Sequence, residues 1–242
     1  MFKFIKIILF LGFFSSIIVL CFTVFILWKY SPDLPSYNKI LEYEPDLSSR
    51  LYSSDGILLK SYYRQERIYV PIERIPSNLV NAFISSEDKK FYSHYGIDII
   101  AIFRASIFNI ISIFTNQRLI GASTITQQVV KNLLLTNEVS FERKIKEILL
   151  SIRVENILSK NKILELYLND IYLGFRSYGV AAASLNYFNK SIYELDLHEV
   201  AFLASLPKAP NNYNPSIFYN KAIERRNWVI DRMFNNGLID ES

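Results

Sequence analysis

Two carboxylates lie side by side at Glu87 and Asp88, and an aromatic ring and an imidazole follow at Phe91 and His94. A general base for sugar chemistry needs a carboxylate in a partly apolar pocket, because burial raises its pKa toward neutrality. Phe91, one helical turn after Glu87, is a candidate wall for such a pocket. The alternative is a plain helix end with acidic residues and a glycine stop at Gly96.

Uncharged polar side chains gather at a second place in the chain. Ser123 is a candidate helix N-cap, followed at once by hydroxyl and amide groups on Thr126, Gln127 and Gln128. Such density suits sugar hydroxyls, or a diphosphate at a helix N-terminus. Lys131 adds a positive charge in the same helix. The alternative is a solvated helix face.

A third group combines cations with an acid. Arg143 and Lys144 precede Glu147 by four and three residues. An Arg–Glu pair at this spacing is usually a surface salt bridge, which is the alternative here, although the basic residue comes first, the weaker order for a helix. The group could instead hold an anionic leaving group beside a second acid.

Composition restricts the function classes. The chain has 242 residues, 27 Lys and Arg against 23 Asp and Glu, a single cysteine and two histidines. This balance argues against a basic nucleic-acid binder, and the few Cys and His residues exclude a disulfide scaffold and a Cys/His zinc site. An aromatic content of 15% excludes a disordered chain.

The N-terminus predicts a membrane anchor. No charged residue occurs from Ile7 to Trp28, and a helix of that length spans roughly 33 Å, slightly more than the hydrocarbon core of a bilayer. A cleaved signal peptide is the alternative, but the apolar run is too long and lacks a small-residue cleavage site. Lys3 and Lys6 predict that residues 1–6 stay in the cytoplasm and that the rest of the chain lies outside.

The remaining chain predicts a mainly α-helical domain. A proline-containing tether covers residues 29–49, and a short β-hairpin is expected around Ser54-Asp55-Gly56. Helical periodicity runs from about residue 78 almost to the end. A capping-box pattern at Ser191–Glu194 predicts the start of one helix, and Gly237 predicts the end of the last.

One segment is apolar around nearly its whole circumference. Ile97–Phe114 holds 13 hydrophobic residues in 18. A core helix is one interpretation. A segment that dips into the membrane surface and meets a lipid substrate is the other. Eighteen residues are borderline for a second membrane span.

Motif order is more specific than any single group. Two further motifs follow the three groups above: Lys160-x-x-Ile163-Leu164-Glu165-x-Tyr167-Leu168-Asn169 and Gly179-Val180-x-x-Ala183-x-x-x-Tyr187-Phe188-x-Lys190. In this order the five motifs resemble those of family 51 glycosyltransferases, over about residues 50–236. The lead-in from Arg50 to Pro76 is most similar to the N-terminal part of class A penicillin-binding proteins.

The resemblance implies a peptidoglycan glycosyltransferase domain over residues 50–242 with a lysozyme-like helical fold and a small hydrophobic jaw lobe. The substrate would be lipid II, polymerised at the outer face of a bacterial cytoplasmic membrane with inversion and loss of undecaprenyl diphosphate. By motif position, Glu87 matches the general base and Glu147 the second essential carboxylate. The matching substrate-site residues are Asp88, Phe91, His94, Ser123, Thr126, Gln127, Gln128, Lys131, Arg143 and Lys144.

The resemblance also bears on cofactors and partners. A divalent cation, Mg²⁺ or Mn²⁺, is allowed, with Glu147 as its candidate ligand, and no organic cofactor or nucleic acid is expected. A transpeptidase or other cell-wall machinery is the expected protein partner. One departure is Val139, because a basic residue commonly occupies that position in the family, so a diphosphate contact is expected to be missing.

Two other functions stay open from the sequence. A lytic transglycosylase on a lysozyme-like fold would need one acid and no cationic group, and a non-catalytic cell-wall scaffold would need neither carboxylate. The length also suggests a fragment of a bifunctional penicillin-binding protein, since no transpeptidase domain is present in the 242 residues.

Overall fold

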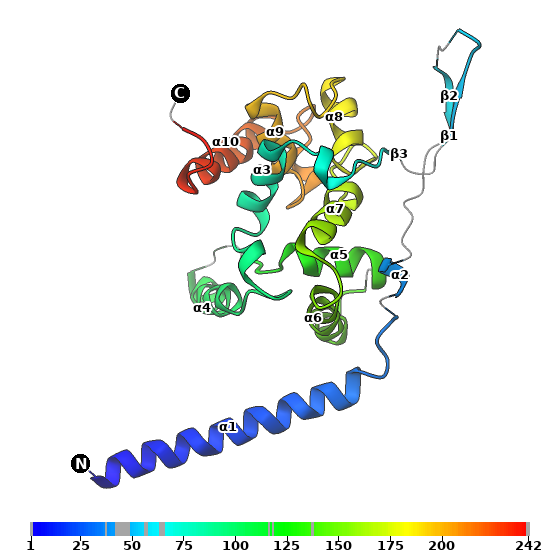
Figure 1. The fold of residues 1–242 in the computed structure, drawn as a ribbon. Coiled ribbons are helices and arrows are strands. Elements are labelled where there is room, and N and C mark those ends of the chain that lie inside the picture. Colours follow the sequence, from blue (N-terminus) through cyan, green and yellow to red (C-terminus); the bar gives the residue numbers. More distant parts are fainter. Residues whose placement is uncertain are drawn as a thin grey trace.

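The computed structural model describes residues 2–36, 38–41, 49–55, 58–62, 66–115, 117, 119–136 and 138–240. Within them the chain is mainly helical, as predicted (Figure 1). The helices are α1 (Phe2–Tyr30), α2 (Asn38–Leu41), α3 (Ser77–Glu87), α4 (Ile99–Thr115), α5 (Ile125–Leu134), α6 (Phe141–Glu155), α7 (Lys160–Asp170), α8 (Val180–Phe188), α9 (Leu197–Ser205) and α10 (Tyr219–Asn235). Single 3₁₀ turns are η1 (Ile72–Arg74), η2 (Phe91–Ser93) and η3 (Pro210–Tyr213), and the strands are β1 (Ser49–Tyr52), β2 (Leu58–Tyr62), β3 (Glu66–Arg67) and β4 (Ser177–Tyr178).

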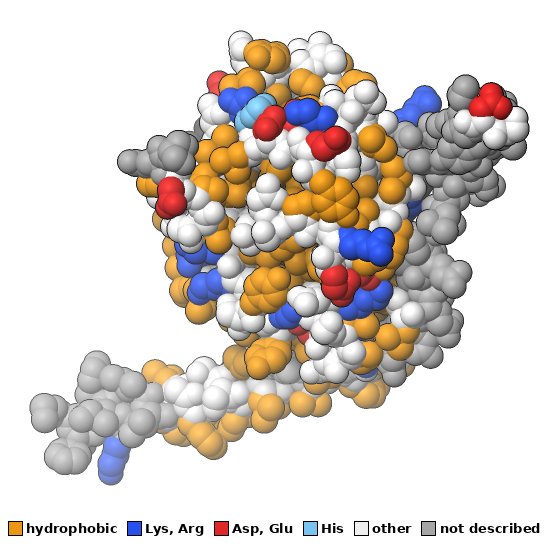
Figure 2. Space-filling view, turned by 45° about the horizontal axis from the view of Figure 1, so that its top comes forward, with side chains coloured by type: hydrophobic (Ala, Val, Ile, Leu, Met, Phe, Trp, Pro, Cys, Tyr) orange, Lys and Arg blue, Asp and Glu red, His pale blue; other side chains and the backbone are white. Residues whose placement is uncertain are grey.

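The N-terminal helix α1 stands apart from the helical body (Figure 1). Its segment Phe10–Tyr30 is long and apolar enough to cross a membrane, and its most apolar stretch is not buried by the rest of the protein. Figure 2 shows exposed hydrophobic side chains along the described part of this helix. Length and composition therefore fit the predicted anchor. Its end is tied to the body, since Arg153 of α6 donates a hydrogen bond to the Ser31 hydroxyl over 2.5 Å.

The predicted β-hairpin is confirmed. Strands β1 and β2 pair antiparallel, with Arg50 opposite Ser61 and an irregularity between Leu51 and Tyr52. The glycine expected in its turn, Gly56, lies outside the described residues. A second, two-stranded parallel pairing joins β3 to β4 and so links the segment after the hairpin to the second half of the domain.

Helix α7 lies at the centre of the domain. All residues from Ile163 to Asp170 are buried, and α7 contacts α5, α8 and η1. Polar side chains on its buried surface bind the chain that follows β3: Glu165 accepts hydrogen bonds from the Tyr69 hydroxyl over 2.5 Å and from the Ile72 backbone N–H over 2.9 Å. The fourth motif thus builds the core and holds an incoming segment, rather than forming a ligand site.

Helices α3, α9 and α10 pack on one another beside α7. Helix α9 begins at Leu197, with a capping box between Asp196 and Glu199. The predicted start at Ser191–Glu194 is therefore wrong. Ser191 and Glu194 form an isolated turn, closed by backbone and side-chain hydrogen bonds, because the residues after it do not continue a helix. The last helix and its end at Gly237, whose φ is +67°, agree with the prediction.

Helix α4 is exposed over most of its length, so the core-helix interpretation of Ile97–Phe114 is wrong. Of its residues only Ala105 and Ser112 are buried, although most of its other side chains are apolar. Burial of apolar surface is the main favourable contribution to folding. The apolar side chains of α4 are nevertheless not buried against the rest of the described protein. The exposed large hydrophobic side chains of α4 are Ile99, Ile100, Phe103, Ile107, Ile110, Ile111, Ile113 and Phe114.

Candidate active site

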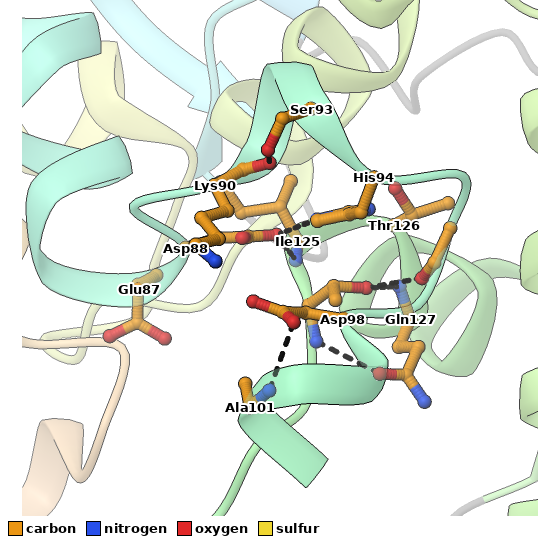
Figure 3. Close-up of polar contacts among 12 residues, drawn as sticks. Glu87, Asp88, Lys90, Ser93, His94, Asp98, Ala101, Ile125, Thr126 and Gln127 are labelled. Carbon is orange, nitrogen blue, oxygen red and sulfur yellow. Dashed lines mark hydrogen bonds and ion pairs between the residues drawn. The ribbon is translucent and has the colours of Figure 1, made fainter. Parts of the chain in front are cut away.

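Glu87 is the last residue of α3, and the helix places its carboxylate at the edge of a cavity. Apolar side chains including Leu79 and Phe83 bury one face of α3, which fixes the direction of the helix. Backbone φ at Asp88 is −153°, so the chain leaves the helix directly after Glu87. Figure 3 shows the Glu87 side chain pointing away from the polar cluster around Asp88.

The surroundings of Glu87 suit a general base. Gln128 of α5 donates a hydrogen bond from Nε2 to Glu87 Oε2 over 2.9 Å. Burial raises the pKa of the Glu87 carboxyl, against the lowering effects of the Gln128 hydrogen bond and of the positive charges of Arg225 and Lys208. The predicted rise in pKa is therefore present, and its main cause is loss of solvent.

Asp88 and His94 hold the loop between α3 and α4 in place. Asp88 Oδ2 is 2.9 Å from His94 Nε2 and accepts a hydrogen bond from the Ile125 backbone N–H over 3.0 Å (Figure 3). Ile125 is the first residue of α5, so the Asp88 carboxylate occupies the positive end of that helix. Both side chains are almost fully buried. They build the site, as the resemblance implies, and expose little surface to a substrate.

Phe91 does not follow Glu87 along a helix. Because α3 ends at Glu87, Phe91 falls in the separate turn η2, where it is fully buried. Its ring packs edge-on to the His94 ring, with centroids 6.2 Å apart, and the Lys160 ammonium lies 4.6 Å from the Phe91 centroid. The prediction that Phe91 forms one helical turn with Glu87 is therefore wrong.

Thr124, rather than Ser123, caps α5. The Thr124 hydroxyl accepts from the Gln127 backbone N–H, and the Gln127 side chain accepts in return from the Thr124 N–H over 2.9 Å. Thr126 donates to Glu155 Oε1 over 2.6 Å. Thr126 and Gln127 are completely buried and engaged in these bonds. Both side chains hold the start of the helix and do not line the cavity, whereas Ser123, Thr124 and Gln128 do.

The acid of the third motif lies between two cations. Arg143 Nη1 donates to Glu147 Oε2 over 2.9 Å, and the Lys144 ammonium donates to Glu147 Oε1. Glu147 is only 2% exposed, so the alternative of an ordinary surface salt bridge is wrong. Lys144 also donates to the Ser123 hydroxyl over 2.9 Å, which joins this group to the edge of the cavity.

This arrangement does not fit a divalent cation at Glu147. Both carboxylate oxygens already accept hydrogen bonds from positively charged groups. Mg²⁺ and Mn²⁺ need oxygen ligands with free lone pairs and an excess of negative charge.

The remaining predicted contacts are separate from this group. Lys131 is exposed on the last turn of α5, and among the described residues it forms no hydrogen bond or ion pair. Val139 precedes the N-cap Ser140 of α6 and is 95% exposed. A basic side chain at that position would point into solvent near the start of α6.

A cavity of about 610 Å³ opens beside Glu87. It lies between the C-terminal end of α3, the N-terminal start of α5, one side of α4, and α10. Sequence reasoning missed the contribution of α10, whose lining residues are Arg225, Trp228 and Arg232, and that of Lys208. The sequence did contain one indication of this surface: Arg225, Trp228 and Arg232 are spaced by three and four residues, which places them on one face of a helix.

The sequence that contains these site residues is similar to known proteins. Residues 55–234 match the family described as Transglycosylase. Penicillin-binding protein 1A of Rickettsia typhi is 51% identical over 232 residues, which cover 95% of this chain and 30% of that protein. Penicillin-binding protein 1A of Escherichia coli K12 is 43% identical over 220 residues, covering 90% and 26%. A crystal structure of penicillin-binding protein 1A from Haemophilus influenzae aligns with 82% of this chain and 20% of that chain, at 29% identity and a TM-score of 0.44. The chain spans less than a third of the length of the curated relatives it matches.

Proposed function

The chain belongs to the transglycosylase family, and from that premise we propose that it is a peptidoglycan glycosyltransferase that polymerises lipid II into glycan strands. The observation that carries the proposal is Glu87, a carboxylate of raised pKa at the edge of a 610 Å³ cavity. The buried acid Glu147 is bound by two cations, and one of them, Lys144, also donates a hydrogen bond to Ser123 in the cavity lining.

The reaction uses the two carboxylates differently. Glu87 takes the proton from the 4-hydroxyl of the acceptor sugar, and that oxygen forms a bond to the anomeric carbon of the growing chain. The bond from this carbon to the diphosphate breaks on the opposite side, so the configuration inverts. The undecaprenyl diphosphate leaves with the electron pair of the broken bond.

The leaving group needs positive charge at the moment the bond breaks. Arg143 and Lys144 supply it, and Glu147 holds both cations in position before substrate arrives. Preorganised charges of this kind act without a reorganisation cost during the reaction. Lys131 is exposed on the neighbouring helix α5 and would add a further cation on the donor side.

Membrane attachment fits a substrate that carries a lipid. Helix α1 anchors the chain, and we assign residues 30–242 to the extracytoplasmic side because Lys3 and Lys6 precede the apolar segment. The exposed apolar face of α4 would rest in the membrane surface, beside the lipid tail of the substrate. In the natural context we expect cell-wall machinery, including a transpeptidase, as partner.

A lytic transglycosylase is the second candidate, because a raised pKa at Glu87 also suits a general acid that cleaves glycans. The cations around Glu147 favour polymerisation, since glycan cleavage releases no diphosphate.

One experiment separates the candidates. Purified full-length protein in detergent is incubated with labelled lipid II, with and without Mg²⁺ or Mn²⁺, and in parallel with preformed glycan strands. We expect glycan polymer from lipid II, none from Glu87→Gln, and no cleavage of glycan. Cleavage without polymer would indicate the lytic enzyme, and neither activity would indicate a scaffold. The divalent cation that the family resemblance allows is tested in the same series by adding EDTA.

A further inference from the structure

Two arginines and a tryptophan form a stack on the inner face of α10. The guanidinium carbon of Arg225 lies 3.7 Å from the Trp228 ring centroid, and that of Arg232 lies 4.9 Å from it. All three side chains line the cavity that contains Glu87. A guanidinium group that stacks on an aromatic ring uses its flat face, which leaves the N–H donors on its edge available. Arg225 and Arg232 are called the α10 arginine pair below.

Among the described residues no carboxylate forms a direct ion pair with the α10 arginine pair, and the negative charge that acts on Arg225 across the cavity is that of Glu87. Neither side chain forms a hydrogen bond or an ion pair with a residue that the structure describes, and Nε of Arg225 is buried without a partner. Burial is the main cause that lowers the pKa of Arg225; Tyr213 and Glu87 act in the opposite direction, and the positive charge of Arg232 adds a smaller lowering. A half-buried cation without a partner is costly in a protein. A buried donor without a partner beside an open cavity suits the binding of an anion.

The cavity as a whole is positive. Four further cations line it: Lys89, Lys90, Arg104 and Lys208. Two of its three carboxylates are already engaged, because Asp88 binds His94 and the start of α5, and Asp98 accepts from the Ala101 backbone N–H over 2.9 Å. The third is Glu87, which is bound to Gln128.

This positive region is separate from the group proposed to receive the leaving diphosphate. Lys131, Arg143, Lys144 and Glu147 do not line the cavity. Ser123 does line it, and its hydrogen bond from Lys144 marks the boundary between the two regions. The chain therefore has two cationic groups, one around Glu147 and one on α10, and Glu87 shares the cavity with the second.

Transfer between two lipid-linked sugars involves two diphosphates. One leaves with the donor lipid, and the other stays attached to the acceptor whose hydroxyl Glu87 deprotonates. Since Glu87 and the α10 arginine pair line the same cavity, we propose that this pair binds the diphosphate of the acceptor substrate. The inference rests on the proposed function, and it assigns the acceptor subsite to α10.

Trp228 supports the pair and is not itself a platform for a sugar ring. Both guanidinium groups lie over its ring, so the stacking surface that a sugar would use is taken. The Trp228 ring holds the two guanidinium groups close together despite their like charge. It also fixes the direction of their N–H donors before the diphosphate binds.

A binding measurement tests the inference without turnover. The chain has two tryptophans, so Trp28→Phe in the anchor leaves Trp228 as the single reporter. Full-length protein in detergent is titrated with inorganic pyrophosphate at constant ionic strength. We expect a saturable change in Trp228 fluorescence, and a dissociation constant about tenfold higher in Arg225→Gln and in Arg232→Gln. Arg226→Gln is the matched control, since Arg226 is on the same helix, bonds only the exposed Asn227 side chain and does not line the cavity.

A kinetic measurement identifies the substrate that carries the diphosphate. A preformed lipid-linked glycan serves as donor, and lipid II is varied as acceptor. Arg232→Gln is expected to raise the KM for the acceptor about tenfold, with little change in the KM for the donor. A rise confined to the donor KM would overturn the assignment.

The two tests fail in different ways. Absence of polymer from the intact protein would contradict the proposed function, while the fluorescence titration would still report on the anion site. Absence of a saturable fluorescence change, or equal weakening by Arg226→Gln, would overturn the α10 site even in a protein that polymerises lipid II. Thermal melting of each variant shows whether the fold is intact, and the double variant Arg225→Lys/Arg232→Lys, which keeps both charges, is expected to recover part of the binding.

Discussion

At the scale of single residues, the two predicted carboxylates differ in what surrounds them. Glu87 accepts one hydrogen bond from an amide and lines the cavity, and its partial burial raises its pKa. Glu147 is buried as well, but two cations bind it directly. Two acids in contrasting environments are the usual arrangement for dividing chemical roles. Here one carboxylate is suited to accept a proton, and the other to hold positive charge in place.

Glu87→Gln is expected to lower the rate of polymerisation by about 10²-fold or more. The same change is expected to stabilise the fold near neutral pH. The folded-state pKa of Glu87 lies above its ordinary value, so the ionised side chain lowers stability as pH rises through that pKa. Gln carries no charge and can still accept the hydrogen bond from Gln128. Thermal melting should therefore show a higher Tm for the variant at pH 8 and no gain at pH 4. A lower Tm at pH 8 would mean that the carboxylate stabilises the fold.

Gln128→Ala is expected to move the acid limb of the pH–rate profile to higher pH. Gln128 donates to the Glu87 carboxylate and lowers its pKa. Removing this donor lets the pKa rise further, and a base is lost from the reaction as pH falls through its pKa. The measurement is kcat/KM against pH. Asn132→Ala, on the exposed side of the same helix, is the control and should leave the limb in place.

At the scale of elements, the site depends on how the starts and ends of helices meet. The end of α3 carries Glu87, the start of α5 receives the Asp88 carboxylate, and the Thr124 hydroxyl donates to the Gly96 carbonyl over 2.6 Å. Gly96 has a φ of +83°, and its backbone lies directly against Ser151 of α6. One short loop therefore positions α3, α5 and α6 relative to one another.

Gly96→Ala is expected to destabilise the protein by about 2–4 kcal/mol. An added Cβ would be 2.6 Å from the Ser151 carbonyl oxygen, and alanine rarely adopts a positive φ. The loss should appear as a lower midpoint in chemical denaturation. Gly121→Ala is the matched control, because a Cβ there meets nothing within 4 Å. Equal destabilisation by both changes would show that the close contact at Gly96 is unimportant.

At the scale of the whole molecule, two apolar elements remain outside the core. Helix α1 and helix α4 both expose large hydrophobic side chains, and α4 lines the active-site cavity with its other side. An anchor and an apolar lobe next to the cavity would bring a lipid-linked substrate to Glu87 without removing its tail from the membrane. The family resemblance drawn from the motifs is confirmed by the match over residues 55–234.

Membrane contact by α4 is tested with a label at its end. Cys21 is the chain's single cysteine, so Cys21→Ser with Phe114→Cys carries one fluorophore in full-length protein reconstituted into vesicles. Phe114 is 84% exposed, and we expect nitroxide-labelled lipids to quench this fluorophore strongly. Tyr193→Cys, on an exposed turn between α8 and α9, is the control and should be quenched weakly. Equal quenching at both positions would contradict the proposed contact.

Sequence patterns predicted the helical class, the long apolar N-terminal helix and the hairpin, because these depend on local periodicity, and motif order predicted the family. They were less accurate for caps. Ser191–Glu194 has the spacing of a capping box, as Asp196–Glu199 does, but only the second is followed by residues that pack as a helix. Local patterns cannot rank two such candidates, since tertiary packing supplies most of the stability of a short helix.

The sequence alone therefore determined which residue types are present for the chemistry and which family the chain resembles. Tertiary structure decided which of them meet. The capping and packing of α5 turn Thr126 and Gln127 inward. The packing of α10 on α3 brings Arg225 and Arg232, about a hundred residues further along the chain, to the cavity of Glu87. The physical reason is that periodicity indicates which face of a helix is buried, but only the packing of several helices together determines what the remaining face is near.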